Sequence, residues 1–184
     1  HDLIRAVVPK SAMELTHALQ QLIDSGLVFR RGKSPEYTYT FKHALVQDVA
    51  YDSLLKSRRQ LLHANIAQAI EDRYPSVRNT IPEVLAQHLS TAGQAARSIP
   101  LWRAAAGLAT KRMALKEAIS HLDNAMKDAE TLEPCLDRDR IELDLQASLG
   151  TVYMLAKGWA APEVEHAYAR ANELSASVTD PEDA

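Results

Sequence analysis

The chain has 184 residues, 46% apolar and 24% charged, which is enough length and enough apolar content to bury a core. This composition excludes a disordered chain, and the formal net charge of −3 argues against a protein that mainly coats nucleic acid. A single cysteine, Cys135, excludes an internal disulfide and a thiolate metal cage, and it favours a cytoplasmic location. No apolar run is long enough to cross a membrane. The chain lacks an initiator methionine, and we expect it to be part of a longer protein.

The first helix is predicted after residue 11. Ser11 and Glu14 have the spacing of a capping box, and leucines recur behind them at helical intervals. Gly26 is expected to end this helix, because glycine adopts the left-handed conformation that closes a helix most easily.

A hairpin and a second helix are expected next. Residues 27–31 form a short strand candidate, and residues 36–41 alternate between aromatic residues and threonines, as a half-buried strand does. A helix from about His43 to Leu55 follows. We therefore predict a mainly α protein that begins with a small winged-helix-like unit over residues 1–56.

Residues 57–184 have helical periodicity throughout. The spacing of Thr80 and Glu83 predicts a second capping box at the start of one of these helices. The connections between helices are short, so neighbouring helices are expected to be antiparallel. This part of the chain is predicted to be a helical linker followed by an α-helical array.

The array has the spacing of tetratricopeptide repeats, in which small residues let two helices approach while large ones fill the space between them. A first repeat is carried by Trp102, Ala105, Ala106, Ala109, Ala118, Leu122 and Ala125. A second, less regular one contains Leu149, Gly150, Tyr153, Tyr168 and Ala171. Two repeats are few for such an array, so we expect the last helix to expose an apolar seam through which the chain could form a homodimer.

No catalytic or metal-binding constellation is evident. The seven histidines form no metal-ligand pair of known spacing, and no serine or carboxylate pair is placed for catalysis. Basic residues around Arg30 and Arg31 could contact DNA phosphates, but the helix over residues 14–24 carries no lysine or arginine. A solvated rim or a protein contact is the favoured interpretation, and nucleic acid and membranes are not the expected partners.

His43 is the one candidate binding residue. A strand leads into it and a helix begins after it, so it lies where exposed N–H groups and the helix dipole favour an anion. The alternative is that His43 only caps the helix or packs at the junction, and the residues alone favour that alternative.

Residues 42–50, Lys-His-Ala-Leu-Val-Gln-Asp-Val-Ala, resemble the Met-His-Asp motif that ends the nucleotide-binding module of STAND-type signalling ATPases. In that family the motif lies in a winged-helix domain, and its histidine contacts the phosphate of bound ADP. This role would fall on His43 alone, because Lys42 and Ala44 replace the methionine and the aspartate.

A wider pattern, over residues 18–28, 39–51, 58–67 and 159–165, is similar to one bacterial group of such proteins. Its members combine a class III adenylate/guanylate cyclase domain, an AAA-like predicted ATPase and tetratricopeptide repeats. The resemblance implies a non-catalytic region that couples the ADP or ATP state of the longer protein to a cyclase or a protein partner. The alternative is an ATPase-type transcription regulator, in which the winged helix or a further domain binds DNA.

Overall fold

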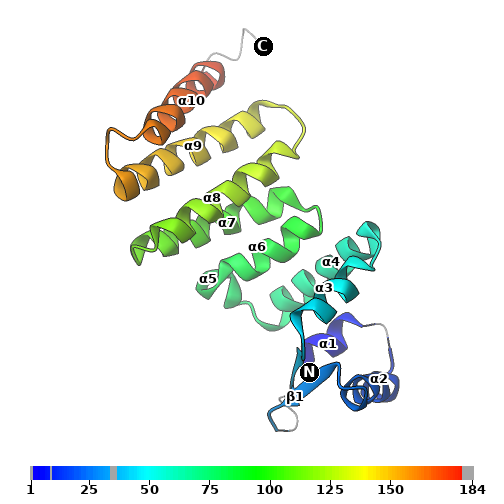
Figure 1. The fold of residues 1–184 in the computed structure, drawn as a ribbon. Helices are drawn as coiled ribbons and strands as arrows, with labels where there is room; N and C mark the ends of the chain where they lie inside the picture. Colours follow the sequence, from blue (N-terminus) through cyan, green and yellow to red (C-terminus); the bar gives the residue numbers. More distant parts are fainter. Residues whose placement is uncertain (1, 9, 34–36, 180–184) are drawn as a thin grey trace. The chain divides into compact units, whose positions relative to one another are not determined.

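The computed structural model describes residues 2–8, 10–33 and 37–179, and the chain forms two compact units, His1–Pro75 and Ser76–Ala184 (Figure 1). The fold is mainly helical with one two-stranded antiparallel sheet, which confirms the predicted class at that level. Among the residues described, no helix has both the length and the apolar composition needed to cross a membrane.

The first unit contains the helix, hairpin and second helix that were predicted for residues 11–55. A short helix precedes them and a long one follows. In chain order the elements are α1 (Asp2–Val7), α2 (Ala12–Asp24), β1 (Val28–Arg31), β2 (Thr38–Phe41), α3 (Ala44–Asp52) and α4 (Lys56–Arg73).

The capping box at the start of α2 is confirmed. The backbone N–H of Ser11 donates to Oε2 of Glu14 at 2.8 Å, and the N–H of Glu14 donates to Oγ of Ser11 at 3.3 Å. These bonds satisfy two of the donors that a helix start leaves open. Gly26, with φ of 71°, closes the other end as predicted, and its N–H donates to the carbonyl of Ile23 at 2.9 Å.

The long helix α4 belongs to the first unit because it packs against α1. Its last turns supply much of that unit's core, since Ala67, Ala69 and Ile70 are buried. The domain boundary predicted after residue 56 falls at the start of α4, whereas the two compact units part after Pro75.

The second unit consists of helices in which each packs against the next, with short connections between them (Figure 1). The helices are α5 (Val77–Thr80), α6 (Pro82–Thr91), α7 (Ala95–Lys111), α8 (Leu115–Glu130), α9 (Leu136–Lys157) and α10 (Pro162–Thr179).

The second predicted capping box is wrong. Helix α6 is capped by Ile81, which makes no side-chain hydrogen bond, and the hydroxyl of Thr80 instead donates to the carbonyl of Ser76 at 3.0 Å. Pro82 occupies the first turn, where its missing N–H costs nothing and its fixed φ suits a helix. The hydroxyl of Thr80 is thus used within the short helix α5 and is not available to cap α6.

The small and large residues expected between α7 and α8 are buried. Their exposed fractions do not exceed 4% in Trp102, Ala105, Ala106, Ala109, Ala118, Leu122 and Ala125. The alanines allow the two helix backbones to approach, and the indole and the leucine fill the remaining space.

The apolar seam expected on the last helix is small. Val164 and Leu174 are buried against α9, and within the described part of α10 the only large apolar side chain that is exposed is Tyr168. The helix therefore uses its apolar face within the unit, so a homodimer through this helix has little apolar area to draw on.

Two turns of the second unit have the same hydrogen-bond pattern, but the residue with the left-handed backbone conformation is a glycine in one and a methionine in the other. Gly93, with φ of 75°, donates to Ser90, and Gln94 donates to Leu89, both at 2.9 Å. In the next turn Met113, with φ of 58°, donates to the carbonyl of Thr110, and the following residue closes the same pattern. A methionine is strained in this conformation because its Cβ crowds the carbonyl oxygen.

We therefore expect Met113→Gly to stabilise the second unit by about 1 kcal/mol, since it removes this strain. Urea unfolding followed by tryptophan fluorescence measures the effect, because Trp102 and Trp159 both lie in this unit. Gly93→Ala is the matched variant and should lose about the same amount. A loss of stability in Met113→Gly would show that the exposed methionine side chain makes a compensating contact.

Candidate functional site

His43 lies at the junction of β2 and α3, as the sequence predicted. Its backbone is extended, with φ of −132° and ψ of 132°, and its carbonyl accepts the N–H groups of Val46 and Gln47 at 3.1 and 3.4 Å. The imidazole is exposed and makes no capping hydrogen bond to the helix. The first turn of α3 also lacks an acidic residue, so no side-chain charge there compensates the positive end of the helix dipole.

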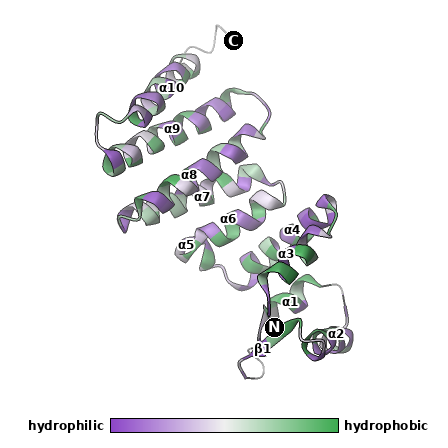
Figure 2. Cartoon of the chain, in the orientation of Figure 1, coloured by the Kyte–Doolittle hydropathy of each residue, from purple (hydrophilic) through white to green (hydrophobic). Residues whose placement is uncertain are grey.

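Helix α3 presents exposed apolar residues beside His43, and Figure 2 shows part of this helix in green, the hydrophobic colour. None of its residues is buried. Leu45 and Val49, one helical turn apart, are 73% and 62% exposed. Exposed apolar surface of this kind is typical of a face that another protein segment covers.

The opposite end of α3 is held to α4 by an aromatic pair. The hydroxyl of Tyr51 and Nε2 of His63 lie 3.2 Å apart, and the two rings meet edge to face with centroids 5.9 Å apart. The guanidinium of Arg59 lies over the Tyr51 ring at 5.1 Å. Partial burial lowers the pKa of His63 and so favours its neutral form. His63 therefore serves a contact between α3 and α4.

The second unit has a groove of about 700 Å³ between α7, α8 and α9. Its lining is mostly apolar, with Arg103 and Lys111 as its cations and no acidic residue. Gly107 contributes bare backbone, and nothing lies within 4 Å of the position that a Cβ would take there. Arg103 also forms an ion pair with Asp144 of α9 at 3.2 Å.

A buried carboxylate ties three helices of this unit together. Asp128 of α8 is only 7% exposed. It accepts hydrogen bonds from the hydroxyl of Ser90 on α6 at 2.7 Å, from the hydroxyl of Ser98 on α7, and from the indole N–H of Trp102 at 3.1 Å. A buried carboxylate is tolerated only when its oxygens are paired in this way.

A second pocket, of about 420 Å³, lies between α6, α7 and α8 and is lined by His88, His121 and Trp102 among others. The imidazole of His121 stacks on the Trp102 indole, with centroids 5.6 Å apart. In the part of the chain that the structure describes, Nδ1 of His121 is the one buried side-chain polar atom without a hydrogen-bond partner. No group of three potential metal ligands occurs among those residues.

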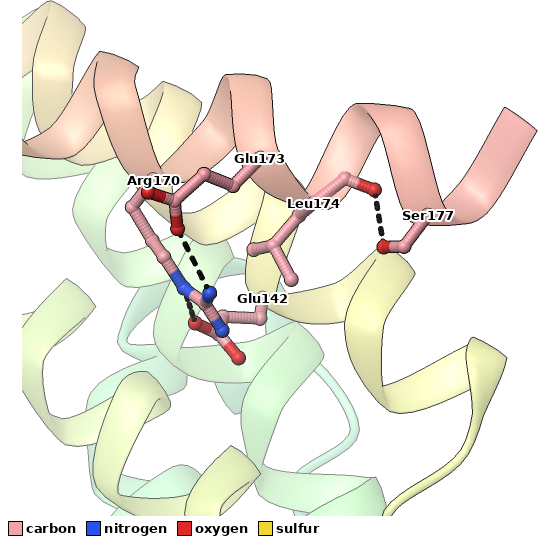
Figure 3. A network of polar contacts seen from close by, with 5 residues as sticks. All are labelled: Glu142, Arg170, Glu173, Leu174 and Ser177. Atoms are coloured by element: carbon pink, nitrogen blue, oxygen red, sulfur yellow. Dashed lines mark hydrogen bonds and ion pairs between the residues drawn. The ribbon is translucent and has the colours of Figure 1, made fainter. Parts of the chain in front are cut away.

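Helices α9 and α10 meet at a glycine. A Cβ on Gly150 would lie 2.9 Å from two ring carbons of Tyr168, whose hydroxyl is 3.2 Å from that of Thr151. Further along the pair, Nε of Arg170 donates to Glu142 of α9 at 2.8 Å, and its Nη1 donates to Glu173 at 3.1 Å (Figure 3). Close packing and a cross-helix ion pair therefore fix this second helix pair.

The structure places the single predicted site residue, His43, on the surface of the first unit, whereas the groove and the Asp128 network lie in the second. Sequence reasoning missed the Asp128 network. One signal in the sequence could have revealed it. Asp128 follows Ala125 by three positions and so lies on the buried face of α8, where a carboxylate needs hydrogen-bond donors from other helices.

Comparison with known proteins shows a similarity to an uncharacterized bacterial protein. Over 176 residues, which is 94% of its length, the chain is 26% identical to a protein of Rhizobium meliloti (strain 1021) that is described as uncharacterized. The match covers only 17% of that much longer protein. No protein-family model and no solved structure matches the chain.

Two glycines of the second unit are expected to respond oppositely to alanine. Alanine is more favourable than glycine in a helix by about 1 kcal/mol, so Gly107→Ala, which meets open space, should be stabilising by about that amount. Gly150→Ala should be destabilising by about 1 kcal/mol, because its Cβ collides with Tyr168. Urea unfolding provides both values.

A double-mutant cycle isolates the cause. In a Tyr168→Ala background the collision is absent, and Gly150→Ala should then become stabilising. If Gly150→Ala were equally harmful in both backgrounds, the ring contact would not be the reason for the glycine.

Proposed function

We propose that this chain is a non-catalytic regulatory and protein-interaction region of a multidomain signalling ATPase. In this proposal residues 1–56 are the winged-helix-like end of the ATPase module, and residues 57–184 are a linker and the start of a tetratricopeptide-like array. The nucleotide state, ADP or ATP, is sensed at His43. The array transmits that state to an attached adenylate/guanylate cyclase or to a protein partner.

The observation that carries the proposal is the state of the His43 side chain. An imidazole that only capped or packed at the junction would be hydrogen-bonded or covered, but this one is exposed and makes no capping bond. It lies at a helix start whose dipole is not compensated by an acidic side chain, with the lysine of position 42 next to it. A phosphate group is the kind of ligand that such a position attracts.

Two surfaces support the interaction role. The exposed leucine and valine of α3 suit a face that is covered by a neighbouring domain. The groove between α7, α8 and α9 has a mostly apolar lining of the kind that a protein segment covers. The much longer bacterial relative is consistent with further domains that would supply these partners.

The alternative is a transcription regulator in which this region accompanies a DNA-binding domain. It draws support from the exposed Arg30 and Arg31 of β1, which could contact phosphates. Helix α2, however, offers no lysine or arginine to a DNA groove and carries Glu14 and Asp24. The adjoining domain of the longer protein distinguishes the two functions, since a cyclase core favours the first and a helix-turn-helix the second.

The test is calorimetric titration with ADP and ATP of this chain and of a longer protein that includes the preceding ATPase module. We expect only the longer protein to bind, and we expect His43→Ala to weaken its ADP affinity about tenfold or more, as the loss of a charge-assisted bond to phosphate does. If the longer protein carries a cyclase, its basal activity should rise in the same variant.

The control variant is His17→Ala, which removes another exposed histidine of the first unit. Because the His43 imidazole makes no capping bond, its removal should leave unfolding by urea nearly unchanged, so a loss of ADP affinity would not reflect misfolding. Unchanged ADP affinity in His43→Ala would remove the sensor role and leave only the helical interaction region.

A further inference from the structure

The hairpin of β1 and β2 has an inner face, turned to the rest of the first unit, and an outer face, turned to solvent. Directly paired residues share a face, so the register Val28↔Phe41 and Arg30↔Tyr39 defines the inner side, on which Val28 is buried. The outer side follows from Phe29↔Thr40 and Arg31↔Thr38, and all four of its side chains are exposed. Lys42 continues the outer side beyond β2, by the same alternation.

This outer face, made by Phe29, Arg31, Thr38, Thr40 and Lys42, is cationic. Between Gly26 and Gln47 the sequence has four lysines and arginines and one acidic residue, Glu36. Among the described residues neither Arg31 nor Lys42 has an acidic partner. The whole chain has a net charge of −3, so this local excess is opposite in sign to the rest.

The face also holds an exposed aromatic ring. Phe29 is 47% exposed, and Nζ of Lys42 lies 5.5 Å from its ring centroid. The pair keeps a cation and an apolar surface together, which is the combination that a carboxylate next to an apolar side chain would match. The two threonine hydroxyls add hydrogen-bonding groups that suit a protein backbone or a side chain.

We propose that the outer face of the hairpin binds an acidic protein segment, with carboxylates on Arg31 and Lys42 and an apolar side chain against Phe29. A nucleic acid fits less well, because the outer face carries a single aromatic ring, Phe29, whereas single-stranded nucleic acid is usually bound by several rings on which successive bases stack. The neighbouring α2 has two acids and no lysine or arginine, which also disfavours a phosphate backbone. Binding at this face is a separate proposal from nucleotide sensing at His43, and it requires no nucleotide.

The test uses fluorescence anisotropy with a fluorescein-labelled peptide rich in glutamate and leucine, the same peptide with glutamine for glutamate, and labelled single-stranded oligothymidine. Of the three probes, we expect only the acidic peptide to bind. Its affinity should fall steeply with salt, since its ion pairs with Arg31 and Lys42 would be exposed to solvent. The double variant Arg31→Glu/Lys42→Glu should weaken binding at least tenfold. Phe29→Ala should weaken it severalfold without changing the salt dependence.

The matched control is Lys116→Glu/Lys127→Glu, which makes the same change of net charge on exposed residues of α8. It should leave binding of the acidic peptide within about twofold. Equal losses in both double variants, or no binding of the acidic peptide, would overturn the proposal. Tighter binding of oligothymidine that depends on Arg31 and Lys42 would assign the face to nucleic acid instead. No nucleotide is needed in these measurements, so their outcome is distinct from that of the ADP titration.

Discussion

The second unit depends on one buried carboxylate. Asp128 lies in the last turn of α8, and the two hydroxyls and the indole N–H that donate to it come from α6 and α7. Without these donors the desolvation of the charge would cost several kcal/mol, so the helices cannot slide relative to one another without leaving it unpaired. The alanines between α7 and α8 bring the backbones close, and the carboxylate specifies one arrangement of that contact.

Whether a feature of the fold could be predicted depends on how far apart in the sequence its interacting residues lie. The capping box of Ser11 and Glu14, the end of α2 at Gly26 and the buried alanines are set by neighbours within a turn or by periodicity, and all were predicted from sequence. The cap at Thr80 failed because a competing local bond to Ser76 used its hydroxyl. The Asp128 network joins residues 26 to 38 positions apart, and no local pattern encodes such contacts.

The two units differ in how much of their apolar surface they bury within themselves. In the second, the apolar side of α10 is used against α9, and Gly150 admits the Tyr168 ring between the helices. In the first, an entire helix, α3, has no buried residue although it carries leucine and valine one turn apart. An amphipathic helix that buries nothing contributes little to the stability of its own unit. Exposed apolar side chains of this kind are typical of a surface that another protein segment covers.

The junction at His43 places this apolar face next to the cationic one. The outer side of the hairpin ends at Lys42, the imidazole follows, and Leu45 begins the exposed side of α3 two residues later. An anion held by His43 and an acidic segment held by Lys42 would therefore be close enough to repel each other through solvent. Coupling of this kind is reciprocal, so an acidic partner on the hairpin would weaken anion binding at His43 to the same extent that the anion weakens the partner. With both proposed ligands, the strand–histidine–helix order of residues 38–52 would let the first unit oppose them electrostatically without a conformational change.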